Sequence, residues 1–170
     1  GSRGANGVII ITTKNGRQKK SSQIGFASYY GTQTITKEIP MLSGQEFAKA
    51  YNQLRGQTYY PDPTIFGQGT NYQNEIFREA PIYNVQFSAN GVSDLMTYNL
   101  SANYFKQDGV LKNTAFERGT FRLNTETKLN SWLSFGSNIS YAISKNHNGP
   151  NVVTSAYRMP SVLAPYKEDG

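Results

Sequence analysis

The sequence predicts an all-β fold, an antiparallel up-and-down meander that forms an incomplete part of a large transmembrane β-barrel. Three observations predict it. Apolar and polar residues alternate with a period of two along several long segments. Short and long connections between these segments alternate along the chain. Aromatic residues make up 13% of the chain and charged residues only 16%, whereas soluble domains average about 25% charged residues.

The predicted strands lie near residues 22–33, 82–91, 95–107, 118–129 and 132–145. In the third of these, Met96, Tyr98 and Leu100 fall on one face, and Thr97 and Asn99 fall on the other. Strands of soluble proteins usually run about 5–6 residues, whereas strands that cross a membrane need about 9–11. The length and the two-faced pattern together indicate a wall with lipid on one side and a wet lumen on the other.

The connections between the predicted strands differ in length. Tight turns are predicted at Val92–Asp94 and at Asn130–Ser131, and long loops at 35–81, at 108–118 and after residue 146. In outer-membrane barrels the short turns face the periplasm and the long loops face the outside. Trp132 follows a tight turn and Tyr104 lies near the opposite strand end. Aromatic girdles are therefore expected at those two levels.

The longest loop is predicted to contain a short helix. Ser43 and Glu46 have the spacing of a capping box, and Gly56 supplies a stop signal. The apolar residues that follow the cap at helical spacing are Phe47, Ala50, Tyr51 and Leu54. A second short helix is predicted over 73–78, ended by Pro81.

The N-terminal residues differ from the rest of the chain. The continuous apolar run Val8–Ile11 is typical of a strand buried on both faces, which we assign to a plug inside the barrel. The predicted domains are the C-terminal end of the plug at 1–16 and the N-terminal portion of the barrel at 17–170. The glycine-rich start, Gly1–Gly7, lacks the Gly-Lys-Ser/Thr ending of a phosphate loop and leads into a strand. It is therefore interpreted as a structural turn.

The composition argues against an enzyme, a cofactor site and a nucleic-acid site. The net charge is +6, but the basic residues are scattered, and the cluster Arg17–Lys20 is interpreted as a solvated linker or as a contact with anionic head groups. The absence of cysteine excludes a disulfide framework, a thiolate zinc site and a cysteine nucleophile. The one histidine, His147, is expected in a polar loop, and Glu75 and Glu79 on the surface of a short helix. No catalytic, cofactor-binding or metal-binding residue is predicted.

Aromatic residues gather in the longest predicted loop. They are Tyr59, Tyr60, Phe66 and Tyr72. Aromatic rings suit two uses in such a loop, stacking on the rings of a sugar substrate and packing the loop against itself. Both interpretations stay open at this point.

The opening residues also carry a family resemblance. GSRGANGVIIITTKNG resembles the end of the plug domain in the SusC/RagA family of TonB-dependent outer-membrane transporters, which makes Gly1, Arg3, Gly4, Asn6 and Gly7 a structural plug-end motif. Similar resemblances extend over roughly residues 1 to 145. They are carried by the segments 74–81, 98–101, 104–110 and 121–124.

The resemblance implies a function for a longer protein. Such proteins import oligosaccharides or peptides across the bacterial outer membrane, contact its lipid, receive energy from the TonB complex and pair with a SusD-like lipoprotein. Since barrels of this kind use about 22 strands, the present chain is expected to be an excerpt that neither transports alone nor stays monomeric. The alternative is a soluble β-rich carbohydrate-binding module, in which the apolar faces of two half-sheets would pack together.

Overall fold

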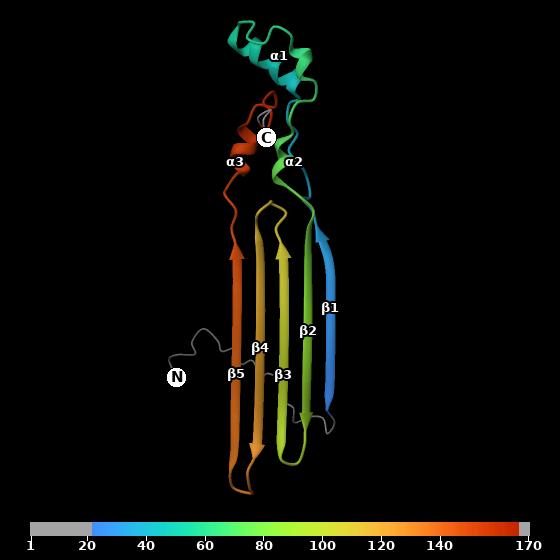
Figure 1. Cartoon of the computed structure of the whole chain (residues 1–170), viewed down its shortest axis with the longest axis vertical. Helices are drawn as coiled ribbons and strands as arrows, with labels where there is room; N and C mark the ends of the chain where they lie inside the picture. The colour runs from blue at the N-terminus through green and yellow to red at the C-terminus, as the bar shows by residue number, and fades with distance from the viewer. Residues whose placement is uncertain (1–21, 167–170) are drawn as a thin grey trace, which may run out of the picture. The chain divides into compact units, whose positions relative to one another are not determined.

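The computed structural model describes residues 22–166. The predicted plug strand at Val8–Ile11, the plug-end motif and the cluster Arg17–Lys20 lie outside these residues. The elements in chain order are β1 (Gln23–Gln33), α1 (Gly44–Arg55), the 3₁₀ helix η3 (Pro63–Phe66), α2 (Tyr72–Ile76), β2 (Ala80–Val92), β3 (Met96–Asp108), β4 (Ala115–Lys128), β5 (Ser134–His147) and α3 (Val153–Arg158) (Figure 1).

The five strands form one antiparallel sheet in the order β1-β2-β3-β4-β5, in which every strand pairs with its neighbours in sequence (Figure 1). The predicted meander is therefore confirmed. The strands run from 11 residues in β1 to 14 in β4 and β5, which is membrane-spanning length. The largest difference from the predicted bounds is at β4, which begins at Ala115 rather than at residue 118.

The chain divides into two compact units. Among the described residues, the first comprises 22–29, 84–105 and 118–144, and the second comprises 30–83, 106–117 and 145–166. The first unit holds the larger part of every strand and the two tight turns, and the second holds the strand ends and all the described helices.

In the first unit, polar side chains close both predicted tight turns. Between β2 and β3, Ser93 N–H donates to Met96 O at 2.7 Å, and Ser93 Oγ accepts from Met96 N–H at 3.0 Å. Between β4 and β5, Asn130 Oδ1 accepts from the backbone N–H groups of Trp132 and Leu133, at 3.1 and 2.7 Å. Ser and Asn side chains fix turns in this way because they replace a backbone acceptor. Both turns are therefore confirmed.

In the second unit, α1 begins and ends as the sequence predicts. Ser43 N–H donates to Glu46 Oε2 at 2.9 Å, and Glu46 N–H donates to Ser43 Oγ at 3.2 Å, which completes the capping box. Gly56 follows the helix at a φ of 62°, a left-handed value that suits glycine. The packed face differs from the predicted stripe, because Ala48 is 0% exposed and Leu54 is 86% exposed.

A buried glutamine ties the segment before α1 to α2. The Gln73 side chain is 2% exposed. Its Nε2 donates to Ile39 O at 2.7 Å, and its Oε1 accepts from Ile39 N–H at 2.9 Å. The carboxamide thus occupies the place of a neighbouring backbone amide, which satisfies both polar groups of Ile39.

The connection between β3 and β4 corrects the prediction of a long loop over 108–118. β3 continues to Asp108 and β4 begins at Ala115, so only residues 109–114 connect them. Gly109 N–H donates to Thr114 O at 2.8 Å, and Thr114 Oγ1 donates to Leu111 O at 2.6 Å. Asn113 takes a positive φ of 62°, which asparagine tolerates. These bonds close the connection early.

Strand-like pairing also shortens the second predicted helix. α2 ends at Ile76, and Phe77 forms an antiparallel bridge with Leu111. Arg78 N–H then donates to Val110 O at 2.8 Å. Glu79 therefore lies outside the helix that was expected to carry it together with Glu75.

Two further differences concern the ends of elements near the C-terminal part of the chain. His147 is the exposed last residue of β5 rather than a loop residue. The helix α3 was not predicted, and its N-cap position is Val152, which makes no side-chain cap hydrogen bond. Without a polar cap the sequence gives no start signal for this helix.

The capping box yields a prediction for α1. Ser43→Ala removes the acceptor of the Glu46 amide and should destabilise the helix by about 1 kcal/mol. We expect the first-turn amides of α1 to exchange hydrogen about fivefold faster in the full-length protein, measured by mass spectrometry. Lys49→Ala, an exposed change in the same helix, is the control. Equal exchange in the two variants would contradict the role of the cap.

A second prediction concerns pH. Hydrogen bonds from Ser43 lower the pKa of Glu46, because they favour the ionised carboxylate. A depressed folded-state pKa contributes stability that is present above the unfolded value, about 4.3, and is lost as the pH falls through the lower folded value. Protection of α1 should therefore decrease below about pH 4.3. Glu46→Gln keeps an acceptor but does not titrate, so this acid-dependent loss should be absent in that variant.

Candidate functional site

The apolar face of the sheet is exposed. Its exposed large side chains include Ile24 (78%), Phe26 (69%), Phe135 (61%), Ile139 (50%) and Ile143 (60%). Within residues 22–166 the buried apolar residues are three alanines, Ala48, Ala80 and Ala156. Burying apolar surface contributes roughly 25 cal/mol per Å². The face therefore lacks a cover among the described residues and is suited to an apolar surrounding.

The height of this face matches a membrane. Apolar residues of β5 and its turn extend from Leu133 to Ile143. Ten steps at about 3.3 Å correspond to about 33 Å along the strand. For a strand tilted by about 40°, this becomes about 25 Å, the height of the apolar band of outer-membrane barrels. Trp132, at the turn end of the band, is 79% exposed, in the place expected for an aromatic girdle.

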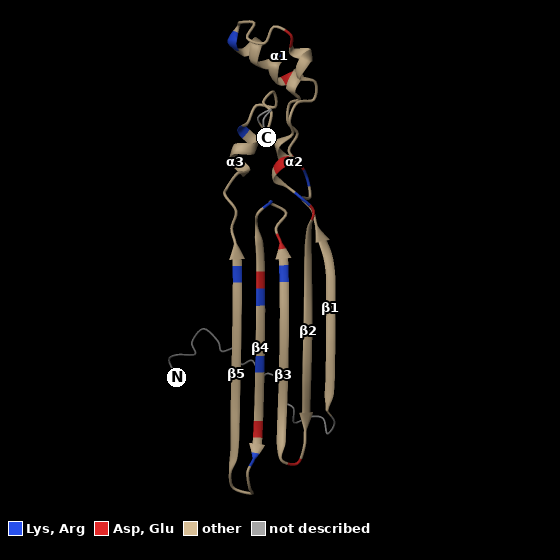
Figure 2. Ribbon diagram, in the orientation of Figure 1, with Lys and Arg blue, Asp and Glu red and all other residues tan. Residues whose placement is uncertain are grey.

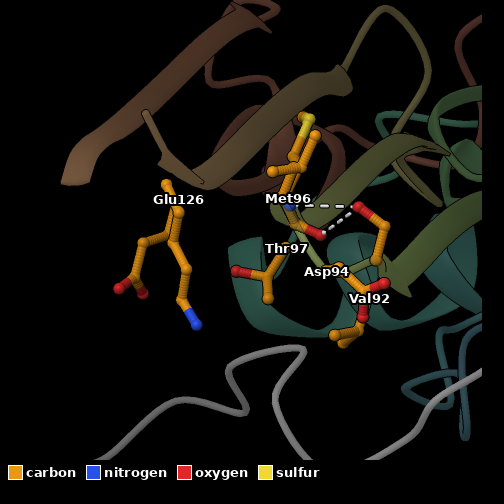
Figure 3. A pocket seen from close by; sticks show the side chains of 8 residues that line it. Val92, Asp94, Met96, Thr97 and Glu126 are labelled. Carbon is orange, nitrogen blue, oxygen red and sulfur yellow. Dashed lines mark hydrogen bonds between the residues drawn. The ribbon is translucent and has the colours of Figure 1, made fainter. Parts of the chain in front are cut away.

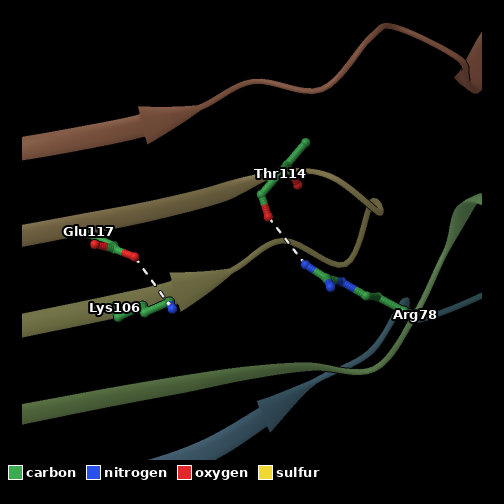
Figure 4. A network of polar contacts seen from close by, with 4 residues as sticks. All are labelled: Arg78, Lys106, Thr114 and Glu117. Atoms are coloured by element: carbon green, nitrogen blue, oxygen red, sulfur yellow. Dashed lines mark hydrogen bonds and ion pairs between the residues drawn. The ribbon is translucent and has the colours of Figure 1, made fainter.

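A charged pair follows the apolar residues of β3. Continuing the alternation, Lys106 comes next on the strand after Tyr104, and its Nζ lies 3.4 Å from Glu117 Oε1 on β4 (Figure 4). The two side chains are 30% and 35% exposed. A pair so accessible to solvent stabilises the fold little. It instead indicates where the apolar surface of these strands gives way to water.

Arginine anchors the short connection near that pair. Arg78 Nε donates to Gly109 O at 3.1 Å, and a terminal guanidinium nitrogen donates to Thr114 O at 3.4 Å (Figure 4). Five fixed donors on a planar group allow one side chain to reach two carbonyls. The segment before β2 and the β3–β4 connection are thereby held together.

The opposite, polar face of the sheet is rich in neutral amides. Asn103 Nδ2 donates to Asn84 Oδ1 at 2.9 Å, and Gln107 Nε2 donates to Gln33 Oε1 at 2.8 Å. β1 and β2 carry no charged residue (Figure 2). The face can therefore form hydrogen bonds with water or with an uncharged ligand, as the wall of a wet lumen does.

Three of the four predicted aromatic site residues come together in the second unit. Tyr59, Tyr60 and Phe66 join Phe47 and Tyr51 of α1 in what we call the aromatic cluster. Ring centroids lie 5.4 Å apart between Tyr51 and Tyr59, and 5.3 Å apart between Tyr60 and Phe66, both edge to face. Such contacts are the favourable geometry for aromatic pairs.

An asparagine of α1 fixes the two tyrosines. Asn52 Oδ1 accepts from the N–H groups of Tyr59 and Tyr60 at 2.8 and 2.9 Å, and its Nδ2 donates to Tyr60 O at 2.8 Å. The Arg55 guanidinium also lies 5.4 Å from the centroid of the Tyr51 ring. Tyr59 remains 65% exposed, so the cluster both packs the loop and presents one ring.

Tyr72 does not belong to the aromatic cluster. It begins α2, and its hydroxyl donates to Leu163 O at 3.0 Å. Sequence reasoning also missed Tyr51 and Asn52 as members of the site. The i, i+4 spacing of Phe47 and Tyr51 was a usable signal, because such residues lie on one helix face. No local pattern marks Asn52, whose partners lie in the following loop.

A groove lies beside the start of α1. Its volume is about 450 Å³, and its lining includes Glu38, Ile39, Met41, Leu42 and Asn71. Ile39, Met41 and Leu42 are each between 44% and 52% exposed. Asn71 Nδ2 donates to Glu38 Oε2 at 3.2 Å. The groove combines apolar side chains with two carboxylates, Glu38 and Glu46, and Glu46 is the partner of Ser43 in the capping box.

The described residues offer no metal site, since no group of three or more His, Asp or Glu side chains lies close enough together to hold an ion. Among the helices in 22–166, none is both long and apolar enough to cross a membrane. The carboxylates Asp62 and Glu46 are used locally. Asp62 Oδ1 accepts from Thr64 N–H and Oγ1, and these bonds lower the pKa of Asp62.

No family model matches the chain. Three curated proteins are similar to it. "TonB-dependent receptor P3" of Formosa agariphila is 34% identical over 181 residues, which cover 100% of the chain and 18% of that protein. "TonB-dependent receptor P26" of the same organism is 32% identical, over 100% of the chain and 18% of that protein. "TonB-dependent receptor SusC" of Bacteroides thetaiotaomicron is 31% identical, over 86% and 14%. The chain thus spans less than a fifth of each relative.

Solved structures agree with the fold. The RagAB peptide importer in its closed-closed state superposes with a TM-score of 0.76 at 24% identity, over 100% of the chain and 24% of that chain. The open-open state of the RagAB peptide importer gives a TM-score of 0.62 at 26% identity, over 85% and 20%. The open five-stranded sheet therefore has the fold of one part of a much longer chain.

The aromatic cluster yields a prediction. Tyr60→Ala removes a half-buried ring with three aromatic neighbours. It should destabilise the closed loop by about 2 kcal/mol, which raises the population of the open loop roughly thirtyfold. Limited proteolysis of the full-length protein at residues 56–71 should accelerate accordingly. Leu54→Ala, which truncates an exposed side chain of the same unit, should leave the rate nearly unchanged. An equal acceleration in both variants would show that the rings do not hold the loop.

Proposed function

We propose that this chain, which belongs to the SusC/RagA-type TonB-dependent transporters and spans a part of one, forms the start of the barrel wall of an outer-membrane importer. Residues 17–170 would be the first barrel strands with their loops, and residues 1–16 the end of the plug. The proposal rests on one observation above the others. The apolar face is exposed along a membrane-sized height, while the opposite face is lined by polar groups, among them paired neutral amides.

Transport is proposed for the whole protein rather than for this part. Within residues 22–166, β1 and β5 each have one neighbouring strand in the sheet. In lipid, each unpaired backbone group costs several kcal/mol, so a membrane barrel must close. Additional strands of the longer chain would supply the missing pairs. The same exposed apolar face argues against a soluble carbohydrate-binding module, in which a second sheet would cover it.

The proposed partners follow from the relatives. Outer-membrane lipid would contact the apolar face. The TonB complex would supply energy, since the curated relatives are named TonB-dependent receptors. A SusD-like lipoprotein would pair with the full-length protein, in line with the likeness to SusC and to the RagAB peptide importer. No enzymatic reaction is proposed.

Two cargo classes are proposed, oligosaccharides and peptides. The solved RagAB complex is a peptide importer. The exposed Tyr59 ring and its neighbours Tyr60 and Phe66 would contact the cargo, because aromatic faces stack on sugar rings and on apolar side chains alike. Tyr72, whose hydroxyl is bonded to Leu163 O, would contribute only its ring.

The test exploits the two faces of β4. Phe121, 38% exposed, lies on the apolar face, and its neighbour Thr120 lies on the polar face. Phe121→Lys should cost about 2–4 kcal/mol near the middle of the bilayer and reduce the fraction of folded full-length protein in outer-membrane preparations. Thr120→Lys, the matched control, should fold almost as well as the unmodified protein. The folded fraction is measured as the fraction of protein that resists unfolding in detergent and digestion by protease.

Equal folding of the two lysine variants would contradict a wall with lipid on one side. Greater damage from Thr120→Lys than from Phe121→Lys would contradict it as well, because it would place the polar face in the drier surrounding. Recovery of the unmodified full-length protein outside the outer-membrane fraction would overturn the proposed location.

A further inference from the structure

One tyrosine or charged residue from each strand falls at a common level, just beyond the apolar residues of the sheet. We call this set the boundary row, and its members are Tyr30 of β1, Tyr83 of β2, Lys106 of β3, Glu117 of β4 and Lys145 of β5. All five belong to the second unit. The row does not follow from any one segment of the sequence, because it depends on how the strands pair.

The connection between β3 and β4 fixes the centre of the row. Gly109 N–H donates to Thr114 O at 2.8 Å, so these two residues lie opposite each other. Three residues back into each strand, Lys106 lies opposite Glu117. The distance of 3.4 Å between Lys106 Nζ and Glu117 Oε1 agrees with this register and shows that the two side chains share a face (Figure 4).

Glu117 also has a lysine on its other side. The Ile143 side chain lies against Gly119, in the same register that the hydrogen bonds of the β4–β5 turn set. Two residues farther along each strand, Lys145 lies opposite Glu117, and a step of two returns to the same face. Figure 2 shows this level as a red band on β4 between blue bands on β3 and β5. One carboxylate therefore stands between two ammonium groups.

Two tyrosines continue the row to the first strands. The hydrogen bonds of the β2–β3 turn set a register in which Tyr83 lies opposite Lys106. On β1, Gly31 lies against the Ile82 side chain. One residue back along β1, Tyr30 consequently lies opposite Tyr83. The Tyr30 ring is 72% exposed, and tyrosine rings are enriched where a membrane meets water.

The row lies on the apolar face, at the end of the sheet away from the two tight turns. It comes one step of the alternation after Tyr104 on β3 and after Ile143 on β5. In outer-membrane barrels the end opposite the short turns faces the outside. The row is therefore at the level of the headgroups of the outer leaflet. This placement rests on the proposed function, which puts lipid against the apolar face.

The two lysines of the row differ in how far their charge is used. Lys106 is bonded to Glu117, and Asp108, the next residue of β3 on this face, lies on the same side. The Lys145 side chain is exposed and has no ion-pair partner among residues 22–166. Its next neighbour on the face of β5 is His147, which is not acidic. Lys145 is thus the cation whose charge is left for a ligand.

The chemistry of the row indicates a lipid phosphate. The stem of a lysine covers apolar surface while its ammonium group reaches the polar layer, where it binds phosphate oxygens as a point charge. We propose that the boundary row binds the phosphate of an outer-leaflet lipid at Lys145, with Lys106 adding to the positive field. The tyrosines of the row contact the boundary between headgroup and acyl chains. A free phosphate ion has no acyl chains to contact the neighbouring apolar face, so the lipid is the favoured source.

The test uses the full-length protein, purified in a neutral detergent. The probes are monophosphoryl lipid A, the same glycolipid after removal of its phosphate, and inorganic phosphate. Native mass spectrometry over a titration gives the dissociation constant of each lipid. The phosphorylated lipid should bind at least about fivefold more tightly than the dephosphorylated one. An equal concentration of inorganic phosphate should not displace it.

Two variants of the row should change this binding in opposite directions. Lys145→Gln should weaken binding of the phosphorylated lipid about fivefold, the contribution of one lysine near a charged membrane surface. Glu117→Gln should strengthen it, because the variant removes the carboxylate that competes with the phosphate for both ammonium groups. If the ion pair of the row were purely structural, the two variants would not change lipid binding in opposite directions.

A lysine at the other end of the sheet supplies the matched control. Lys128 lines a hollow of about 420 Å³ by the β2–β3 turn, together with Asp94 and Glu126 (Figure 3). It lies 11 residues from Glu117 on β4, roughly 36 Å at about 3.3 Å per residue. Since salt screens charges beyond about 10 Å, Lys128→Gln should change the dissociation constant by less than about twofold. Protease resistance in the outer membrane checks that every variant folds.

Four results would overturn the inference. They are equal binding of the two lipids, unchanged binding in the Lys145→Gln protein, weaker binding in the Glu117→Gln protein, and displacement of the lipid by an equal concentration of inorganic phosphate. The proposed function is judged separately, by the folding of the two β4 lysine variants and by outer-membrane location. If those hold while the lipid phosphate makes no difference, only the headgroup site falls.

Discussion

Pairing between neighbouring strands is the constraint on which the other features of this structure depend. A lipid surrounding offers no partner to backbone N–H and C=O groups, so each strand must satisfy them through its neighbours. That pairing also decides which side chains share a face. On β4 it puts Phe121 and Leu123 on one side of the sheet and Thr120 and Arg122 on the other. The apolar surface and the polar surface of the sheet are both consequences of one register.

The two faces of the sheet are suited to different surroundings, and the strands achieve this with few charged residues. The strand charges are concentrated on β4, whereas β1 and β2 have none (Figure 2). Neutral amides and hydroxyls can line a wet passage without attracting ions strongly, and this leaves selectivity to hydrogen-bond geometry and shape. The aromatic cluster of the second unit supplies a different kind of contact, since the exposed Tyr59 ring offers an apolar face.

Local signals explain which parts could be predicted. The period of two gave the strands, and Ser43, Glu46 and Gly56 gave α1, because those patterns act within a few residues. The early closure at 109–114 was not predicted, since its own hydrogen bonds act together with the pairing of Phe77 with Leu111, which is distant in sequence. The role of Asn52 was missed for the same reason. Each arises from residues that meet only after the chain has folded.

The central claim is that the two faces of the sheet meet two different solvents. It is tested most directly by attaching an environment-sensitive fluorophore at single cysteines along β4 of the full-length protein in lipid vesicles. The account predicts that probes at 121 and 123 are quenched by a lipid-borne quencher, and that probes at 120 and 122 are quenched by a water-soluble one. Quenching that does not alternate along the strand, or alternates in the opposite sense, would contradict it.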